Sequence, residues 1–454
     1  MIRTDSRKVM PGDTFVALKG FSSNGNEYID SAISKGAARI VCDEGSYSVP
    51  TINVPDTRKW LEENLEAEYG SIVSQMKIVG VTGTNGKTST CFFFYTAMNM
   101  LGIKCAYLGT IGFYLDGKVR SLPNTSVDLC DLYEYLLEAH SQGYDVVALE
   151  ASSQGLDMGR LNTISFDAAA FTNLTEEHLD YHQTMEKYAL AKQILFRQLK
   201  PGGLAVVNAD DPYAGYFLLE GNKNITYGFG QGDINITDCR FGDRTEFCFT
   251  AEGRRYDVSM QMPGTYNIQN IICMAAMMHH LGVPYEDIVR VIPELSTPNG
   301  RYNVFNYGTN KIIVDYAHTP DAMEKTIEAA RGITKGNIYT VFGCPGSRDR
   351  YKRPVMLHIA LTNCAFNIIT VDDLNNETAE EILHDMFEGN TLTNYEIELN
   401  RKEAIYKGIS HLQDNDTLLI MGKGHEDFIK VGKDRIPHND VQVVKEFLER
   451  NGRQ

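Results

Sequence analysis

Apolar and polar positions along the chain alternate between short strand-like runs and longer amphipathic segments, which is the pattern of an α/β protein. Near the start, apolar runs at residues 13–20 and 38–44 are separated by polar residues. A charged segment with helical character, residues 57–76, follows them. The pattern therefore predicts a small α/β domain over residues 1–76.

From Lys77 the order becomes strand, glycine loop and helix. Strand-like runs at residues 145–152, 167–174 and 203–211 repeat this order, with helices between them. Strands that alternate with helices are typical of a parallel sheet covered on both faces. We expect this part of the chain to form a central domain over residues 77–297.

A short run with proline and glycine, residues 296–301, is typical of a hinge. The strand-then-loop order resumes after it, in the runs 312–330, 338–346, 366–374 and 416–424. This order is typical of a doubly wound, Rossmann-like sheet. We therefore expect a third domain over residues 298–454.

The composition of the chain indicates which partners and which cellular compartment to expect. The formal net charge of −16 argues against a surface for polyanions, so we do not expect nucleic acid as a partner. The chain has neither an apolar run of about 18 residues nor an apolar signal core, which predicts a cytoplasmic protein without membrane insertion. Its nine cysteines form no C-x-x-C pair, and we expect reduced, mostly buried thiols rather than a disulfide or zinc framework.

The stretch "GVTGTNGKT" carries the clearest chemistry. Gly80, Gly83 and Gly86 allow a tight turn in which backbone N–H groups and the next helix N-terminus face a phosphate. Lys87 adds a charge for the outer phosphates, and Thr88 adds a hydroxyl suited to Mg²⁺. Because the loop follows a strand and precedes a helix, we favour a nucleotide-phosphate site over a glycine turn with a solvated lysine.

Two other features have more than one interpretation. Glu150 ends a strand-like run, where a carboxylate either holds a metal or is a solvated cap. His178, Asp180 and His182 cluster after another such run, and they either ligate zinc or satisfy hydrogen bonds of the loop. Lys192 follows on an amphipathic helix, a position where a lysine is usually a surface charge.

The chain resembles the Mur ligases in six stretches, which occur in the order "GTNGKTS", "FTNLTEEHLDYHQTMEKYALAKQILF", "NADD", "DYAHTPDAM", "FGCPGSRDRYKRP" and "GKGHED". The opening "DSRKVMPGDTFVALKGFSSNGNEYI" is similar to that family's nucleotide-sugar domain. The resemblance therefore spans essentially the whole chain. It implies a three-domain α/β architecture, with a small N-terminal domain, a central P-loop parallel-sheet domain and a C-terminal Rossmann-like domain.

Within the family, the chain looks most like the members that add the third residue of the peptidoglycan stem peptide. The resemblance implies an amide bond between the D-glutamate carboxylate of UDP-N-acetylmuramoyl-L-alanyl-D-glutamate and the amine of an amino acid. ATP would activate the carboxylate as an acyl phosphate. The implied cofactors are ATP, Mg²⁺ and a CO₂-derived carbamate on Lys192, and we expect a monomer.

Family match implies residues for catalysis and for the nucleotide. The catalytic residues would be Lys87, Glu150, His178 and Lys192. The metal ligands would be Thr88, Glu150, His178 and the carbamate of Lys192. The ATP-binding residues would be Gly83, Thr84, Asn85, Gly86, Lys87, Thr88, Ser89, Asn267, Asn270, Arg301, Asp315 and His318.

The acceptor is implied to contact residues from the first two domains. The UDP-sugar-peptide residues would be Ser6, Arg7, Asn124, Thr125, Ser126, Ser153, Gln154 and Arg160. Gln154 is a departure, because the family often has histidine there. A neutral amide still forms hydrogen bonds, so we expect the pocket to be retained.

The implied amino-acid pocket consists of Arg348, Asp372, Asp373, Asn375, Gly422 and Glu426. Members that use meso-diaminopimelate carry D-N-P-R, whereas residues 372–375 read D-D-L-N. Asn375 cannot bind a carboxylate in the bidentate way of an arginine, and the paired aspartates favour an amine. We therefore expect lysine or ornithine to be preferred over meso-diaminopimelate.

Three alternatives stay open. One is a related amide ligase that acts on a different nucleotide-sugar peptide or on a polyglutamate-like chain, although the N-terminal resemblance counts against the latter. Another is a nucleotide-binding regulatory paralogue without ligation, which would not need Lys87, Glu150, His178 and Lys192 together. The weakest is a motor-type or signalling P-loop ATPase.

Overall fold

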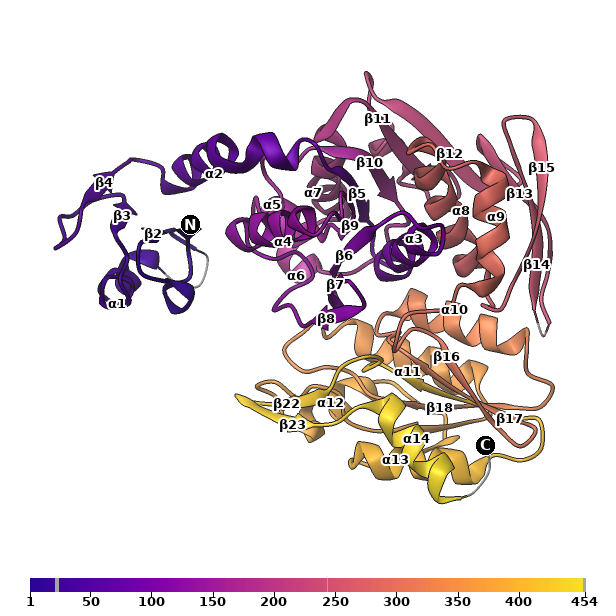
Figure 1. The fold of residues 1–454 in the computed structure, drawn as a ribbon. Coiled ribbons are helices and arrows are strands. Elements are labelled where there is room, and N and C mark those ends of the chain that lie inside the picture. Colours follow the sequence, from indigo (N-terminus) through magenta and orange to yellow (C-terminus); the bar gives the residue numbers. More distant parts are fainter. Residues whose placement is uncertain (21–23, 243, 452–454) are drawn as a thin grey trace.

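Three sheets of four or more strands organise the chain, and each is built from a different stretch of sequence (Figure 1). The computed structural model describes residues 1–20, 24–242 and 244–451. Residues 21–23, which belong to the opening stretch compared above with a nucleotide-sugar domain, lie outside the described residues, as do residues 452–454 of the predicted third domain.

The first sheet is parallel and has the order β1-β2-β3-β4. Helix α2 leads from it to the central part of the molecule (Figure 1). The elements of this part are β1 (Ile2–Arg3), η1 (Ser6–Lys8), β2 (Thr14–Val16), η2 (Gly25–Tyr28), α1 (Ile29–Ser34), β3 (Arg39–Cys42), β4 (Thr51–Asn53) and α2 (Thr57–Val73).

The second sheet has the order β15-β14-β13-β12-β11-β10-β5-β9-β6-β7-β8. Its strands are β5 (Lys77–Thr82), β6 (Cys105–Gly109), β7 (Gly112–Leu115), β8 (Lys118–Arg120), β9 (Val146–Glu150), β10 (Phe166–Phe171), β11 (Leu199–Asn208), β12 (Lys223–Phe229), β13 (Ile234–Arg240), β14 (Thr245–Ala251) and β15 (Arg254–Met260). Its helices are α3 (Lys87–Met100), α4 (Leu129–Ser141), α5 (Ser153–Asp157), α6 (Leu179–His182), α7 (Met185–Arg197), η3 (Ala214–Tyr216), α8 (Thr265–His280), α9 (Tyr285–Val291) and η4 (Ile292–Glu294).

Both faces of the central sheet are covered, which explains why its middle strands read as continuous apolar runs. Every residue of β10 is buried. On one face α3 and α8 pack through Phe93 and Ile271, and on the other α4 and α7 pack through Leu136 and Phe196. The predicted parallel sheet is thus confirmed. The antiparallel extensions at its edges, β7-β8 and β13-β14-β15, were not predicted.

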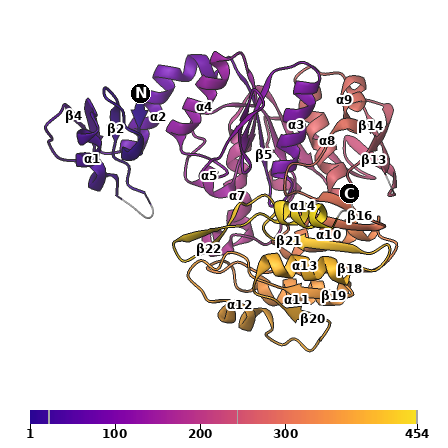
Figure 2. The ribbon, with the colours of Figure 1, turned by 60° about the horizontal axis from the view of Figure 1, so that its bottom comes forward.

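The third sheet has the order β16-β17-β21-β18-β19-β20, parallel except for β16 (Figure 2). This confirms the predicted Rossmann-like pattern. Its elements are β16 (Asn303–Tyr307), β17 (Asn310–Asp315), α10 (Pro320–Arg331), β18 (Ile338–Phe342), α11 (Lys352–Asn363), β19 (Phe366–Ile369), α12 (Ala379–Met386), β20 (Tyr395–Ile397), α13 (Arg401–His411), β21 (Thr417–Met421) and α14 (Asp440–Arg450). A separate antiparallel hairpin consists of β22 (Phe428–Val431) and β23 (Asp434–Pro437).

Three further sequence expectations can be compared with the structure. The domain bounds 1–76, 77–297 and 298–454 fall in connecting segments, because α2 ends at Val73, and η4 ends at Glu294, before β16 begins at Asn303. They stay a prediction. All nine cysteines are free thiols and eight are buried, as predicted. None of the described helices is long and apolar enough to cross a membrane.

A buried ion pair ties the third domain together beside its strand ends. Arg401, at the start of α13, donates to both carboxylate oxygens of Asp440 at 2.8 and 2.7 Å, and both side chains are fully buried. Arg401 also donates to the carbonyls of Val371 and Met421, which follow β19 and end β21. Burial opposes ionisation of Asp440, but the Arg401 guanidinium holds its pKa well below the ordinary range.

We predict that Arg401→Met lowers the free energy of unfolding by about 3–5 kcal/mol, because it leaves the Asp440 carboxylate buried without its cation. Calorimetry of the full chain measures the loss. Lys402→Met is the matched control, since Lys402 forms a more exposed pair with Glu446 and its removal should change stability little. Equal effects of the two substitutions would contradict this account of Arg401.

Candidate functional site

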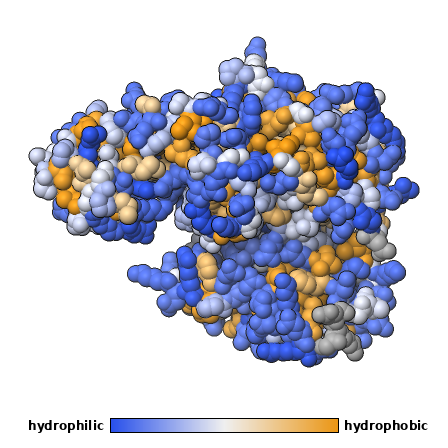
Figure 3. Space-filling model, viewed as in Figure 1, coloured by the Kyte–Doolittle hydropathy of each residue, from blue (hydrophilic) through white to orange (hydrophobic). Residues whose placement is uncertain are grey.

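A cleft of about 960 Å³ lies between the central and third domains. Figure 3 shows a mostly hydrophilic surface where these two parts meet. The cleft is bordered by loops that follow β5 and β10 of the central sheet and β17, β18, β19 and β21 of the third. Ligands collect at the carboxyl ends of parallel strands in such sheets. The predicted site residues lining it are Thr84, Asn85, Gly86, Lys87, Thr88, Ser89, Asn124, Thr125, Gln154, Arg160, His178, Asn267, Asn270, Arg301, Asp315, His318, Arg348, Asp372, Asp373, Asn375, Gly422 and Glu426.

The glycine loop has the geometry of a phosphate cradle. It follows β5, and Gly86 caps α3 with a left-handed φ of 88°. A Cβ at Gly83 would collide with the Thr172 hydroxyl, and one at Gly86 would lie 2.6 Å from Asn270 Oδ1. Both positions therefore need glycine. The N-terminus of α3 points its free N–H groups at this loop, as anion sites do.

The half-buried Lys87 and the buried Lys192 converge on one backbone oxygen of this loop. The amines of Lys87 and Lys192 each donate to the Gly83 carbonyl at 2.8 Å, and Lys87 also reaches the Thr84 carbonyl. Burial lowers the pKa of both amines, that of Lys192 well below its usual value, with Lys87 as a further cause. Lys192 is thus a core residue of α7 and not the surface charge that its helix pattern usually indicates.

Glu150, at the end of β9, is fully buried and surrounded by donors. Thr88 Oγ1 donates to its Oε2 at 3.0 Å, Thr110 donates through both its backbone N–H and its hydroxyl, and Tyr107 donates from β6. Glu150 is therefore not a solvated cap. Tyr107 and Thr110 were missed in the sequence, because their partner lies 40 or more residues away.

The predicted histidine cluster separates in the structure. His182 is buried, forms a 2.9 Å hydrogen bond with Ser153 and stacks on Tyr188 at 4.9 Å between ring centroids. His178 is half-exposed at the cleft, 3.7 Å from the Glu177 carboxylate. Within the described part of the chain, His178, Asp180 and His182 do not form a group that could share one metal ion. The hydrogen-bonding interpretation therefore fits His182 better than zinc ligation.

Polar contacts join the central and third domains across the nucleotide loop. His318 lies 3.0 Å from the Glu177 carboxylate, Asn85 donates to Asp321 at 3.0 Å, and Arg301 reaches Thr88 Oγ1 at 3.4 Å. Burial opposes ionisation of Glu177, but the hydrogen bond with His318 lowers its pKa. Each of these contacts thus includes at least one residue that was predicted to contact ATP.

Three residues that were predicted to bind the nucleotide form hydrogen bonds with other residues of the protein. Asp315 accepts hydrogen bonds from the backbone N–H groups of Tyr302 and Ala317, and burial raises its pKa. Asn267 donates to the Pro263 carbonyl, and Asn270 accepts from Thr90. They shape the wall of the cleft at the start of α8 and beside the hinge.

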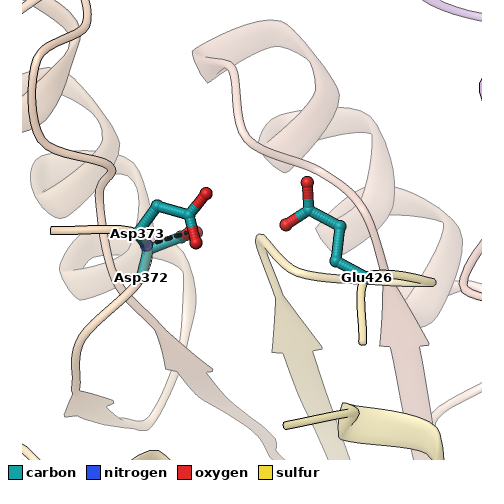
Figure 4. A group of neighbouring side chains, drawn as sticks. All are labelled: Asp372, Asp373 and Glu426. Carbon is teal, nitrogen blue, oxygen red and sulfur yellow. Dashed lines mark hydrogen bonds between the residues drawn. The ribbon is translucent and has the colours of Figure 1, made fainter. Parts of the chain in front are cut away.

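The predicted amino-acid pocket contains a cation that sequence reasoning missed. The buried Lys423 amine pairs with Asp373 at 2.6 Å, with Glu426, and with Asp372 at 3.7 Å. Figure 4 shows these three carboxylates facing one another from two loops. Among the described residues they are the one group of His, Cys, Asp or Glu close enough for a metal ion, but an ammonium already occupies their centre. Lys423 is the lysine of the motif "GKGHED", so the sequence contained the residue although its role was not predicted.

Comparison with known proteins gives matches along most of the chain. The family models "Mur ligase family, catalytic domain", "Mur ligase middle domain" and "Mur ligase, glutamate ligase domain" match residues 1–69, 81–278 and 300–424. The chain belongs to the Mur ligase family. It is an ATP-dependent ligase that joins an acid to an amino acid.

The ligase has relatives of similar length. It is 35% identical to the UDP-N-acetylmuramoyl-L-alanyl-D-glutamate–2,6-diaminopimelate ligase of Bacillus licheniformis, over 98% of this chain and 94% of that protein. Identity to the enzyme of the same name from Bacillus cereus is 36%, over 98% and 93%. A solved structure of a ligase of that name matches with a TM-score of 0.70 and 30% identity, over 100% of this chain and 95% of the other.

Some residues of this Mur ligase that were predicted to bind the UDP-sugar-peptide do not line the cleft. Ser6 is buried in η1, and the exposed Arg7 pairs with its neighbour Asp5, so neither lines the cleft. Ser126 and Ser153 lie buried beneath the cleft surface. Arg160 donates to the Ser126 carbonyl. Asn124, Thr125 and Gln154 do line the cleft.

The buried His182 predicts a dependence of the ligase's stability on pH. Burial, with a contribution from Lys192, lowers the pKa of His182 from 6.5 to about 4. The folded state therefore binds this proton less well than the unfolded state, and stability present above pH 6.5 is lost as the pH falls toward 4. Between pH 7 and 4.5 we expect this residue alone to cost roughly 2 kcal/mol.

His182→Gln should lose less stability than the wild type over this pH range, because glutamine can keep a hydrogen bond to Ser153 without taking up a proton. Thermal unfolding at several pH values measures the difference. His384→Gln is the matched control, since the His384 side chain is 86% exposed. Parallel pH profiles for wild type and His182→Gln would refute the prediction.

Proposed function

We propose that this ligase joins the D-glutamate carboxylate of UDP-N-acetylmuramoyl-L-alanyl-D-glutamate to the amine of a diamino acid, the third residue of the peptidoglycan stem peptide. The observation that carries the proposal is one cleft lined by the phosphate loop at Lys87, by Asn124 and Thr125, and by the acidic pocket around Lys423. A nucleotide, an acid and an amine would meet there. The names of the relatives described above support the same reaction.

The chemistry requires a good leaving group on the acid. A carboxylate oxygen of the acceptor attacks the γ-phosphorus of ATP, ADP leaves, and the acyl phosphate forms. The amine then attacks the acyl carbon, phosphate leaves, and the amine proton is released. Lys87 is suited to neutralising charge on the transferred phosphoryl group, and contacts between Arg301 and Thr88 and between His318 and Glu177 would close the cleft against water.

The residues present fit a magnesium site in part. Thr88 and Glu150 offer oxygen ligands 3.0 Å apart, and His178 lies at the cleft. A bound Mg²⁺ would neutralise phosphate charge during the transfer. Lys192 as an ammonium would repel the ion, but its buried amine has a depressed pKa, so the neutral form that reacts with CO₂ is favoured. We therefore keep the carbamate on Lys192 as part of the proposal.

Two observations bear on the diamino acid. Asn375 donates its side-chain amide to the Gly346 carbonyl at 2.7 Å and offers no cation, which alone favours lysine or ornithine over meso-diaminopimelate. The relatives, by contrast, are named as 2,6-diaminopimelate ligases. The preference for lysine or ornithine therefore stays a prediction.

A second candidate is a Mur-type ligase for a different acceptor. Gln154 favours it, because this cleft residue differs from the family's usual histidine on the acceptor side. A regulatory protein without ligation has less support, because Lys87, Glu150 and Lys192 keep a hydrogen-bonded arrangement at the phosphate loop that ligation would use. Cytoplasmic location and a monomeric state stay predictions.

We expect the purified protein, with ATP, Mg²⁺, bicarbonate and UDP-N-acetylmuramoyl-L-alanyl-D-glutamate, to add one diamino acid from a panel of lysine, ornithine and meso-diaminopimelate. Mass spectrometry of the nucleotide product identifies the residue added. Lys87→Met is the control and should abolish product, since it removes the phosphate-loop amine. Omitting bicarbonate and CO₂ should slow the reaction if Lys192 is carbamylated.

The outcomes separate the candidates. A product with the dipeptide acceptor supports the proposed reaction. Turnover only with another nucleotide-sugar peptide would support the second candidate, and ATP binding without turnover would support a regulatory role. Equal rates with and without CO₂ would contradict the carbamate alone.

A further inference from the structure

The β22-β23 hairpin presents two cations to the amino-acid end of the cleft. Lys430 and Arg435 are direct cross-strand partners, and with Phe428 they line the cleft. The Arg435 guanidinium lies 4.6 Å from the centre of the Phe428 ring, and the Lys430 amine lies 5.7 Å from it. The aromatic ring thus holds both cations on one face of the hairpin.

This arrangement is unfavourable without an anion. Like charges directly opposite each other in an antiparallel pair destabilise it. The Lys430 amine lies 3.9 Å from Asp373 Oδ2, whereas Lys423 pairs with Oδ1 of the same carboxylate. Arg435 forms no ion pair within the described part of the chain. Lys423 and Lys430 offset two of the three nearby carboxylates, and Arg435 brings to the cleft a positive charge that pairs with none of the described carboxylates.

The hairpin is attached to the segment that holds the predicted amino-acid pocket. The Lys430 N–H donates to Asp373 at 2.9 Å, and the Leu374 and Asn375 N–H groups donate to the Lys430 carbonyl at 2.8 and 3.2 Å. These are bonds to the hairpin's backbone, so both cationic side chains are left to face the cleft. The cations consequently lie next to the carboxylates of Asp372, Asp373 and Glu426.

We propose that Lys430 and Arg435 bind a carboxylate on the side chain of the incoming amino acid, the role that Asn375 cannot perform. The inference rests on the proposed function and specifies its substrate as a diamino acid with two carboxylates, such as meso-diaminopimelate. The distal end of such a substrate carries an ammonium and a carboxylate side by side. The acidic group around Lys423 matches the first charge, and the hairpin matches the second.

The charge arrangement thus opposes the preference for lysine or ornithine that Asn375 alone suggests. Lysine and ornithine have only an α-carboxylate, and Arg348 of the implied amino-acid pocket, which lines the same cleft, is suited to bind it. With either of them bound, Arg435 would stay without an anion. A substrate with a second carboxylate removes that cost.

Arg435→Gln should raise the KM for meso-diaminopimelate by roughly tenfold or more, the effect of losing a charge-assisted hydrogen bond. The kcat and the KM values for ATP and for the UDP-linked dipeptide should not change. Lys430→Gln should act in the same direction. Lys433→Gln is the matched control, because Lys433 carries the same charge at the turn of the same hairpin but does not line the cleft.

Steady-state kinetics with meso-diaminopimelate and lysine as competing substrates give the decisive comparison. Loss of discrimination between them in Arg435→Gln, with Lys433→Gln unchanged, supports the inference. It is overturned if the wild type adds lysine or ornithine in preference to meso-diaminopimelate, or if Arg435→Gln and Lys433→Gln behave alike. No UDP-linked product with any amino acid would instead overturn the proposed function itself.

Discussion

The crowding of two lysine amines at the Gly83 carbonyl is the constraint on which the active cleft depends. Lys87 comes from the phosphate loop and Lys192 from α7, more than 100 residues later, and both amines point at the same oxygen. Burial and the charge of Lys87 both disfavour the ammonium form of Lys192, so its pKa is lowered. The surrounding carboxylates Glu150 and Glu177 offset part of that cost, and a nucleotide phosphate would offset more.

Glu177 links this balance of charge to the contact between the central and third domains. Glu177 interacts with Lys87 and Lys192 and also hydrogen-bonds His318 of the third domain. Glu177 therefore makes a contact between the two domains and also offsets positive charge at the phosphate loop. A change in charge on the loop, such as binding a nucleotide, would consequently alter the free energy of the contact between the domains.

Sequence reasoning was most successful where chemistry is encoded locally. The glycine loop at Gly83 and Gly86 was predictable, because only glycine fits those close approaches and the flanking strand and helix have clear patterns. The alternation of strands and helices likewise predicted the doubly wound sheets. The edge strand β8, Lys118–Arg120, was not predictable, since it is exposed and carries no apolar pattern.

Long-range electrostatics set the limit of prediction. Lys423 was overlooked although it follows Gly422 directly, because its carboxylate partners Asp372 and Asp373 lie some 50 residues earlier. The same missing information made the two aspartates look free of any cation of the protein. Tyr107 was missed for the same reason, and Ser6 and Arg7 were matched by motif although neither reaches the cleft.

The mode of attachment of the β22-β23 hairpin has an evolutionary consequence. Its backbone makes the bonds to the Asp373–Asn375 segment, while the side chains on its cleft face make few of the contacts that hold the fold together. Substitutions on that face would change the charge presented to the cleft and leave those backbone bonds in place, so the charge is free to change in evolution while the hairpin is kept.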